Sequence, residues 1–110
     1  MLKLFYRGFS SSARAFDRHV VYLTLFSKNQ CGLCDNFKNS MRTLLAKEEF
    51  VDRLHYRIVD IDEPRNKEWW DNYCFDVPVL HIEDANSESL YKVFHRFNDK
   101  DVSNKIKLLL

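Results

Sequence analysis

The sequence predicts one α/β domain with a four-stranded mixed sheet and helices on both faces, in the order βαβαββα. Three observations support this prediction. A continuous apolar run at 20–26 suits a central strand, helical apolar spacing follows it, and two short apolar runs flank a polar segment at 84–88. The 110 residues suffice for one compact domain and are too few for two.

The first half of the chain is expected to form a strand, a helix and a second strand. Residues 20–26 are β-branched and aromatic without polar alternation, which is typical of a strand buried on both faces. The helix follows Cys34, and Asp35 complements the positive end of its dipole. Its apolar spacing continues to Phe50. A second strand at 56–61 closes a right-handed crossover, so the two strands should be parallel.

The second half is expected to form a short helix, a hairpin and a last helix. Pro64 suits the first position of a helix that is rich in aromatic residues. The runs 79–82 and 90–94 should pair as a hairpin. Asn98 or Asp99 is expected to cap the last helix.

The first 18 residues differ from the rest in charge. They hold four basic residues and one acidic residue, so that residues 19–110 alone carry 13 basic and 15 acidic side chains. Apolar residues at helical spacing, interleaved arginines and the serine run 10–12 are typical of a mitochondrial transit peptide. We therefore predict an N-terminal extension over 1–18, either an import signal or a loosely packed tail, and one domain over 19–110. Without import the protein would be cytoplasmic.

Composition argues against several other classes of protein. The mildly acidic body lacks the basic stripe that nucleic-acid binding needs. No window approaches the roughly 18 apolar residues of a membrane-spanning helix, so no membrane contact is expected. Three cysteines, an odd number, do not suit a secreted disulfide scaffold and indicate a reducing compartment. We expect a monomer.

The cysteines at 31–34, Cys-Gly-Leu-Cys, lie at the predicted junction of the first strand and the first helix. Unpartnered backbone N–H groups and the peptide dipoles at a helix start favour a thiolate, so Cys31 is the expected nucleophile. Lys28 adds a nearby positive charge. Cys34, one turn along and more shielded, is expected to resolve the mixed disulfide.

Simpler interpretations exist for several of these residues. The cysteine pair could be half of a zinc site, which would need Cys74 and a histidine such as His81 as further ligands. The strand position of His81 beside the expected core opposes this. Cys74 is expected to be a small buried or helix-ending residue. Trp69 and Trp70 are expected to pack, with one ring partly exposed.

These motifs resemble the glutaredoxin family of the thioredoxin superfamily. Residues 26–34 are similar to that family's strand end, lysine and Cys-x-x-Cys stretch, and residues 76–80 to its Thr-Val-Pro segment. The resemblance covers about 20–109, and the compact second half is similar to small atypical glutaredoxin-like proteins of fungi, animals and bacteria. It implies a thioredoxin-like fold with a cis Val77–Pro78 bond against the redox pair. The N–H and C=O of Val77 would then pair with an extended substrate strand.

Two departures from the family concern glutathione. Gly32-Leu33 stands between the cysteines where glutaredoxins usually carry Pro-Tyr. The Gly-Gly-Asp that holds the glutamyl end of glutathione is absent, and bulky residues of the segment 95–99 occupy its place. Lys28 could still meet the glycine carboxylate and Val77 the cysteinyl backbone. We therefore expect glutathione to bind weakly.

The predicted function is that of a glutaredoxin-type thiol-disulfide oxidoreductase with catalytic Cys31 and Cys34. Lys28, Val77 and Pro78 would bind the substrate, which is a disulfide-containing protein or a glutathione mixed disulfide. We expect no metal ligands and no tightly bound cofactor, with glutathione as co-substrate. Two alternatives remain: a non-catalytic protein that holds an iron-sulfur cluster through Cys31, or a fold kept for partner binding with redox-inert thiols.

Overall fold

The structure, a computed structural model, describes residues 20–86 and 88–110; the predicted extension over 1–18 lies outside the described residues. Its four-stranded sheet has the order β2-β1-β3-β4, and only the pairing of β1 with β2 is parallel. The predicted mixed sheet and element order are confirmed. The strands are β1 (Val21–Ser27), β2 (Leu54–Asp60), β3 (Val79–Glu83) and β4 (Leu90–Phe94). The α-helices are α1 (Gly32–Leu45), α2 (Lys67–Tyr73) and α3 (Asp99–Leu109).

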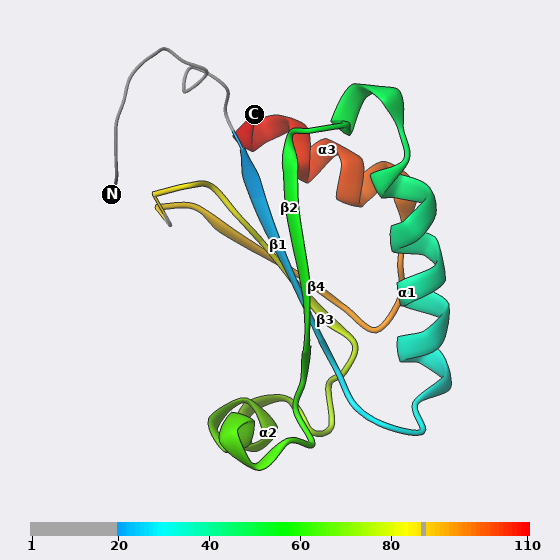
Figure 1. Cartoon of the computed structure of the whole chain (residues 1–110), viewed down its shortest axis with the longest axis vertical. Coiled ribbons are helices and arrows are strands. Elements are labelled where there is room, and N and C mark those ends of the chain that lie inside the picture. Colours follow the sequence, from blue (N-terminus) through cyan, green and yellow to red (C-terminus); the bar gives the residue numbers. More distant parts are fainter. Residues whose placement is uncertain (1–19, 87) are drawn as a thin grey trace.

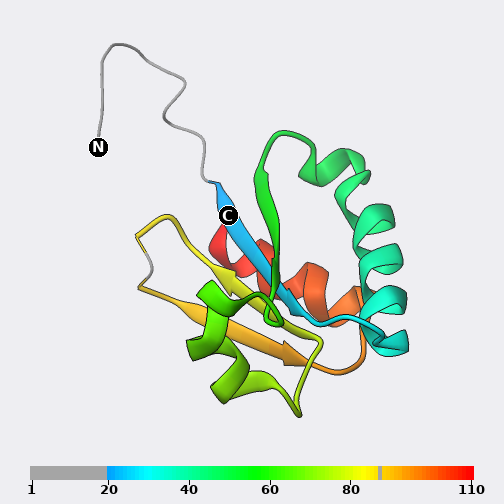
Figure 2. The ribbon, with the colours of Figure 1, turned by 60° about the horizontal axis from the view of Figure 1, so that its bottom comes forward.

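Helices cover both faces of the sheet, as predicted. α1 and α3 lie together on one face, and the short α2 lies on the other near the lower end of the molecule (Figures 1 and 2). None of the helices in the described part of the chain combines the length and the apolar character that crossing a membrane requires.

β1 is the central strand, and six of its seven residues are buried. Leu23 and Leu25 belong to the larger core, which the sheet forms with α1 and α3. Phe26 belongs to a second, smaller core on the α2 side. The prediction of a strand buried on both faces is confirmed except at Tyr22, which is 39% exposed because α2 is too short to cover that end of β1.

Three predicted boundaries differ in the structure. Pro64 begins a 3-10 helix, η3 (Pro64–Asn66), and α2 begins only at Lys67. α1 ends at Leu45 rather than near Phe50, because the chain turns through a 3-10 helix, η2 (Glu48–Phe50). Phe50 nevertheless reaches the same core, which is why the apolar spacing continued to it. β2 begins at Leu54 rather than at 56, because its pairing with β1 extends to Val21.

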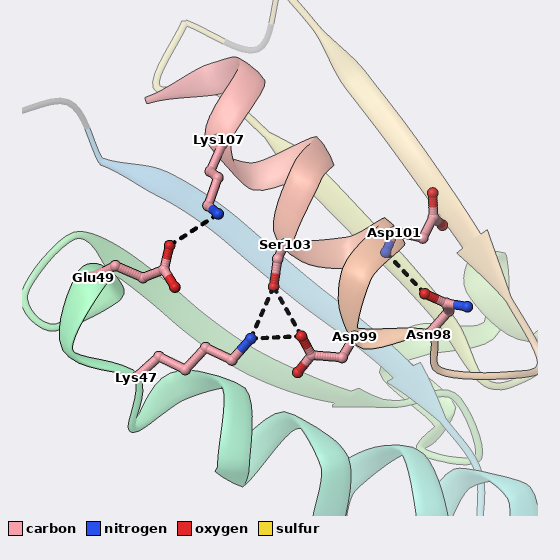
Figure 3. Close-up of polar contacts among 7 residues, drawn as sticks. All are labelled: Lys47, Glu49, Asn98, Asp99, Asp101, Ser103 and Lys107. Atoms are coloured by element: carbon pink, nitrogen blue, oxygen red, sulfur yellow. Dashed lines mark hydrogen bonds and ion pairs between the residues drawn. The ribbon is translucent and has the colours of Figure 1, made fainter.

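Polar contacts attach α3 to the connection between α1 and β2 (Figure 3). The Lys47 ammonium lies 2.5 Å from an Asp99 carboxylate oxygen and 3.2 Å from the Ser103 hydroxyl oxygen. The hydrogen bond from Lys47 holds the pKa of Asp99 below its ordinary value. Lys107 pairs with Glu49 at 3.1 Å. These pairs are partly exposed, so they orient α3 more than they stabilise it.

Asn98 is the N-cap of α3, which decides between the two predicted candidates. Its side-chain oxygen accepts a hydrogen bond from the Asp101 backbone N–H at 2.9 Å (Figure 3). Asn98→Ala is expected to lower the free energy of unfolding by about 1 kcal/mol, because that N–H loses its partner. Urea denaturation followed by circular dichroism would measure this change. Asn98→Asp should retain the stability, and an equal loss in both variants would argue against the capping bond.

Candidate active site: a cysteine pair at the start of α1

The two cysteines of the Cys-Gly-Leu-Cys segment lie where the loop after β1 enters α1 (Figure 1, cyan). Cys31 is the N-cap residue, and its sulfur accepts a hydrogen bond from the Cys34 backbone N–H at 3.1 Å. The two Cα atoms are 5.2 Å apart, and the sulfurs are within disulfide-bonding distance. The Cys31 sulfur therefore accepts a hydrogen bond from one of the backbone N–H groups that have no partner within the helix at its start.

The two thiols differ in exposure. Cys34 is fully buried in the smaller core, whereas Cys31 is half-buried and packs against its edge. An incoming sulfur can thus reach Cys31 more readily than Cys34. This asymmetry suits a pair in which one thiol attacks and the other resolves.

The Val77–Pro78 bond is cis, as the resemblance implies. Both residues are buried, and Val77 belongs to the same small core as Cys34. Tertiary structure thus brings residues from two distant segments to one end of the molecule. The members of this core are Phe26, Cys34, Ile61, Tyr73, Cys74, Val77 and Val79, with Cys31, Val59 and Trp69 packed against them.

The backbone N–H of Val77 has a partner within the chain. It donates to the Tyr73 carbonyl oxygen at 3.1 Å. The N–H is thus used at the end of α2, and the expected pairing of both backbone groups of Val77 with a substrate strand would require this internal hydrogen bond to break.

A carboxylate that sequence reasoning missed fixes the loop before the cysteines. The Asn29 backbone N–H donates to Asp62 at 2.9 Å, and the Ile61 N–H donates to the Ser27 carbonyl oxygen at the same distance. Gln30 adopts a positive φ of 55°. Half-buried Lys28 lies in this restrained loop. The position of Asp62 just after a strand was the available signal, but the contact spans 33 residues.

A groove of about 230 Å³ lies between the start of α1 and the loop between β4 and α3, and its lining includes Leu33, the residue between Gly32 and Cys34. The loop is attached to the proline segment, because the His95 N–H donates to the Pro78 carbonyl oxygen at 2.8 Å. The side chains of His95 and Arg96 are exposed beside the groove and do not fill it. Its lining residues are Leu33, Asn36, Phe37, Ser40, His95, Arg96 and Phe97.

The other residues singled out from the sequence have structural roles. Cys74 is buried and ends α2, as predicted. Trp69 stacks on Tyr73, and Trp70 is 41% exposed, which confirms the predicted division between them. His81 is buried with its Nε2 2.8 Å from the Tyr73 hydroxyl oxygen. Across residues 20–86 and 88–110, no three His, Cys, Asp or Glu side chains gather as a metal site.

His81 should make stability depend on pH. Burial, aided by the positive charge of Lys92, lowers the pKa of His81 from 6.5 to about 4. As the pH falls, His81 of the unfolded chain is protonated before His81 of the folded chain. The contribution of neutral, buried His81 to the free energy of unfolding is therefore complete above pH 6.5 and is lost as the pH falls towards about 4. It amounts to at most about 3 kcal/mol. Urea unfolding between pH 4 and 7 should show this slope in wild type and a smaller one in His81→Leu. Equal slopes would contradict the assignment.

The fold and the cysteine pair define a thioredoxin-fold protein with a Cys-x-x-Cys site at a helix start. The chain belongs to the family described as Glutaredoxin-like domain (DUF836), whose model matches residues 22–107. The predicted resemblance to glutaredoxins within the thioredoxin superfamily is thereby confirmed.

Solved structures share this fold at low sequence identity. A malarial protein is 18% identical with a TM-score of 0.65, and the match covers 83% of this chain and 98% of that one. Thioredoxin-2, a component of the malaria parasite protein secretion machinery, is 17% identical with a TM-score of 0.65, over 82% and 84% of the two chains. Chloroplastic thioredoxin z is 15% identical with a TM-score of 0.68, over 84% and 80%.

Proposed function

We propose that this protein is a thiol-disulfide oxidoreductase of glutaredoxin type. The main support for this proposal is the environment of the Cys31 sulfur. Cys31 is half-buried, and its sulfur accepts a hydrogen bond from the Cys34 N–H at the start of α1. The sulfur of buried Cys34 lies within bonding distance of it. A hydrogen bond to sulfur and the positive end of the helix both favour the thiolate over the thiol. The thiolate is the form that attacks a disulfide.

The reaction has two exchange steps. The Cys31 thiolate attacks one sulfur of the substrate disulfide, forming a mixed disulfide and expelling the other substrate sulfur as a thiolate. Cys34, after losing its proton, attacks the Cys31 sulfur and expels the second substrate thiol. The substrate gains two electrons, and the enzyme is left with the Cys31–Cys34 disulfide. A thiol donor, either glutathione or a dithiol reductase, then reduces this pair again.

Three surrounding features would position the substrate. The Val77 carbonyl oxygen would accept a hydrogen bond from an extended strand beside cis Pro78. Lys28, in the restrained loop, would supply positive charge to the thiolate or to a substrate carboxylate. The groove beside Arg96 would receive the glutamyl end of glutathione, because a guanidinium attracts a carboxylate.

The pH dependence of Cys31 alkylation tests this function. A thiol pKa lowered from about 8.5 to about 6 would raise the thiolate fraction at pH 7 from about 3% to about 90%. We expect iodoacetamide to modify reduced Cys31 with a midpoint well below that of a free thiol, and glutathione to slow the reaction. A midpoint near 8.5 would contradict the proposal.

Lys28→Gln separates the two sources of positive potential at Cys31. The alkylation midpoint should rise in this variant because the lysine charge is lost, and it should stay below that of a free thiol because the helix start is unchanged. Lys38→Gln, on α1 and similarly half-buried, is the matched control and should leave the midpoint near that of wild type. An equal shift in both variants would assign the effect to overall charge and remove Lys28 from the site.

A further inference from the structure

Phe75 has an unusual environment for a large apolar residue. It is 92% exposed, more than any other large apolar residue in the described part of the chain. We infer that Phe75 is a specificity-determining contact, which binds the apolar side chain beside the cysteine of a protein disulfide. This inference rests on the proposed function and names the substrate class of the same site.

A closed turn holds Phe75 outward. The Tyr73 carbonyl oxygen accepts hydrogen bonds from the Asp76 N–H at 2.9 Å and from the Val77 N–H at 3.1 Å, so Phe75 lies at the tip between them. Tyr73 and Cys74 before it and Val77 after it are buried. Because both flanks are anchored in the small core, the exposure of Phe75 does not come from a loose loop. A phenylalanine side chain has only two rotatable bonds, so it loses little conformational freedom when a partner covers it.

Phe75 is close in the chain to Val77, which packs with the redox pair. It is two residues from Val77, which places the two Cα atoms within about 7 Å of each other. Val77 shares the small core with Cys34, and Cys31 packs against that core. Leu33, between the cysteines, is itself 39% exposed. A substrate sulfur bonded to Cys31 would thus bring the neighbouring side chains of its own segment close to exposed apolar surface.

The charges around Phe75 indicate what kind of segment fits. The stretch 68–76 contains Glu68, Asp71 and Asp76 and no Lys or Arg. Lys67 pairs with Asp71 at 3.1 Å, and the Lys92 ammonium lies 5.8 Å from the centroid of the Tyr73 ring. These two lysines set against the three carboxylates leave one negative charge at the turn, which favours a basic substrate segment over an anionic one. Glutathione carries two carboxylates and no apolar side chain, so Phe75 would favour protein disulfides over glutathione disulfides.

The test compares two peptides on three proteins. Each peptide carries one cysteine in disulfide linkage to thionitrobenzoate, with a lysine nearby, and the residue after the cysteine is Leu in one and Ser in the other. Wild type should prefer the Leu peptide by about tenfold in kcat/KM, a typical discrimination for one apolar contact. Phe75→Ser should bring this ratio close to one. The control Leu108→Ser, at a 70% exposed site in the last turn of α3, should retain the wild-type ratio.

A ratio that is the same in wild type and Phe75→Ser would overturn the inference while leaving the oxidoreductase proposal standing. If wild type reduces neither peptide, the proposed function fails, and binding then decides the role of Phe75. An NMR titration of Cys31→Ser with the Leu peptide, its cysteine replaced by serine, should show about tenfold weaker binding after the additional Phe75→Ser change than after Leu108→Ser. Equal affinities in that titration would also overturn it.

Discussion

Cys31→Ser is expected to abolish the reduction of a mixed disulfide, lowering kcat/KM by at least about a thousandfold. A serine hydroxyl stays protonated near neutral pH and forms no bond to sulfur, so no covalent intermediate can arise. Cys34→Ser should instead retain the first exchange step and accumulate the adduct on Cys31. Mass spectrometry after mixing with a glutathionylated peptide distinguishes these outcomes, because only the second variant should gain the mass of the bound thiol.

Cys74→Ser is the matched control, since it removes the third thiol from the same small core without touching the reacting pair. It should turn over at a rate near that of wild type and accumulate no adduct. Equal activity in wild type and Cys31→Ser would refute the proposed chemistry. An adduct that forms on Cys74 would refute the assignment of the nucleophile.

Phe26→Ala is expected to lower the free energy of unfolding by about 3–5 kcal/mol, the usual cost of truncating a buried phenylalanine. The ring is 1% exposed, and its centroid lies 4.4 Å from that of Trp69 and 4.7 Å from that of His81. Its loss would leave a cavity between β1 and α2. Because small domains are stable by only about 5–15 kcal/mol, much of the stability would be lost. Thermal and urea unfolding would measure the change.

Trp70→Ala controls for aromatic content on the same side of the sheet, because its ring is 41% exposed on the surface of α2. Its cost should stay well below that of Phe26→Ala. Phe26→Leu should restore part of the stability by refilling the cavity. If the two alanine variants were equally stable, α2 would not depend on the packing around Phe26.

The small core connects stability to the proposed chemistry. Phe26, Tyr73 and Val77 pack with Cys34, so the redox pair is positioned by the smaller of the two cores. The larger core, between the sheet and helices α1 and α3, contains neither cysteine. Loosening the small core should therefore disturb the site before the whole domain unfolds.

Local pattern predicted most of the architecture, and its errors have local causes. The apolar spacing predicts a helix as far as Phe50, although α1 ends at Leu45. The reason is that Phe50, outside the helix, packs into the same core. The apolar content of β1 predicts burial throughout, yet Tyr22 is exposed. Apolar content does not show where the helix that covers a strand ends. The Cys-x-x-Cys segment was placed correctly at a helix start, because strand end, turn and helix start are adjacent in the chain.

The order of elements, the family and the cysteine pair could be predicted from the amino-acid sequence, because they depend on periodicity and on short motifs within a few residues. Three other features became visible only in the folded chain: Asp62 fixes the loop before Cys31, the N–H of Val77 is bonded to Tyr73, and Phe75 stands exposed. The physical reason is that hydrogen-bond partners and burial depend on which distant segments meet. Which distant segments come into contact depends on sheet pairing and core packing together, and no single stretch of sequence specifies both.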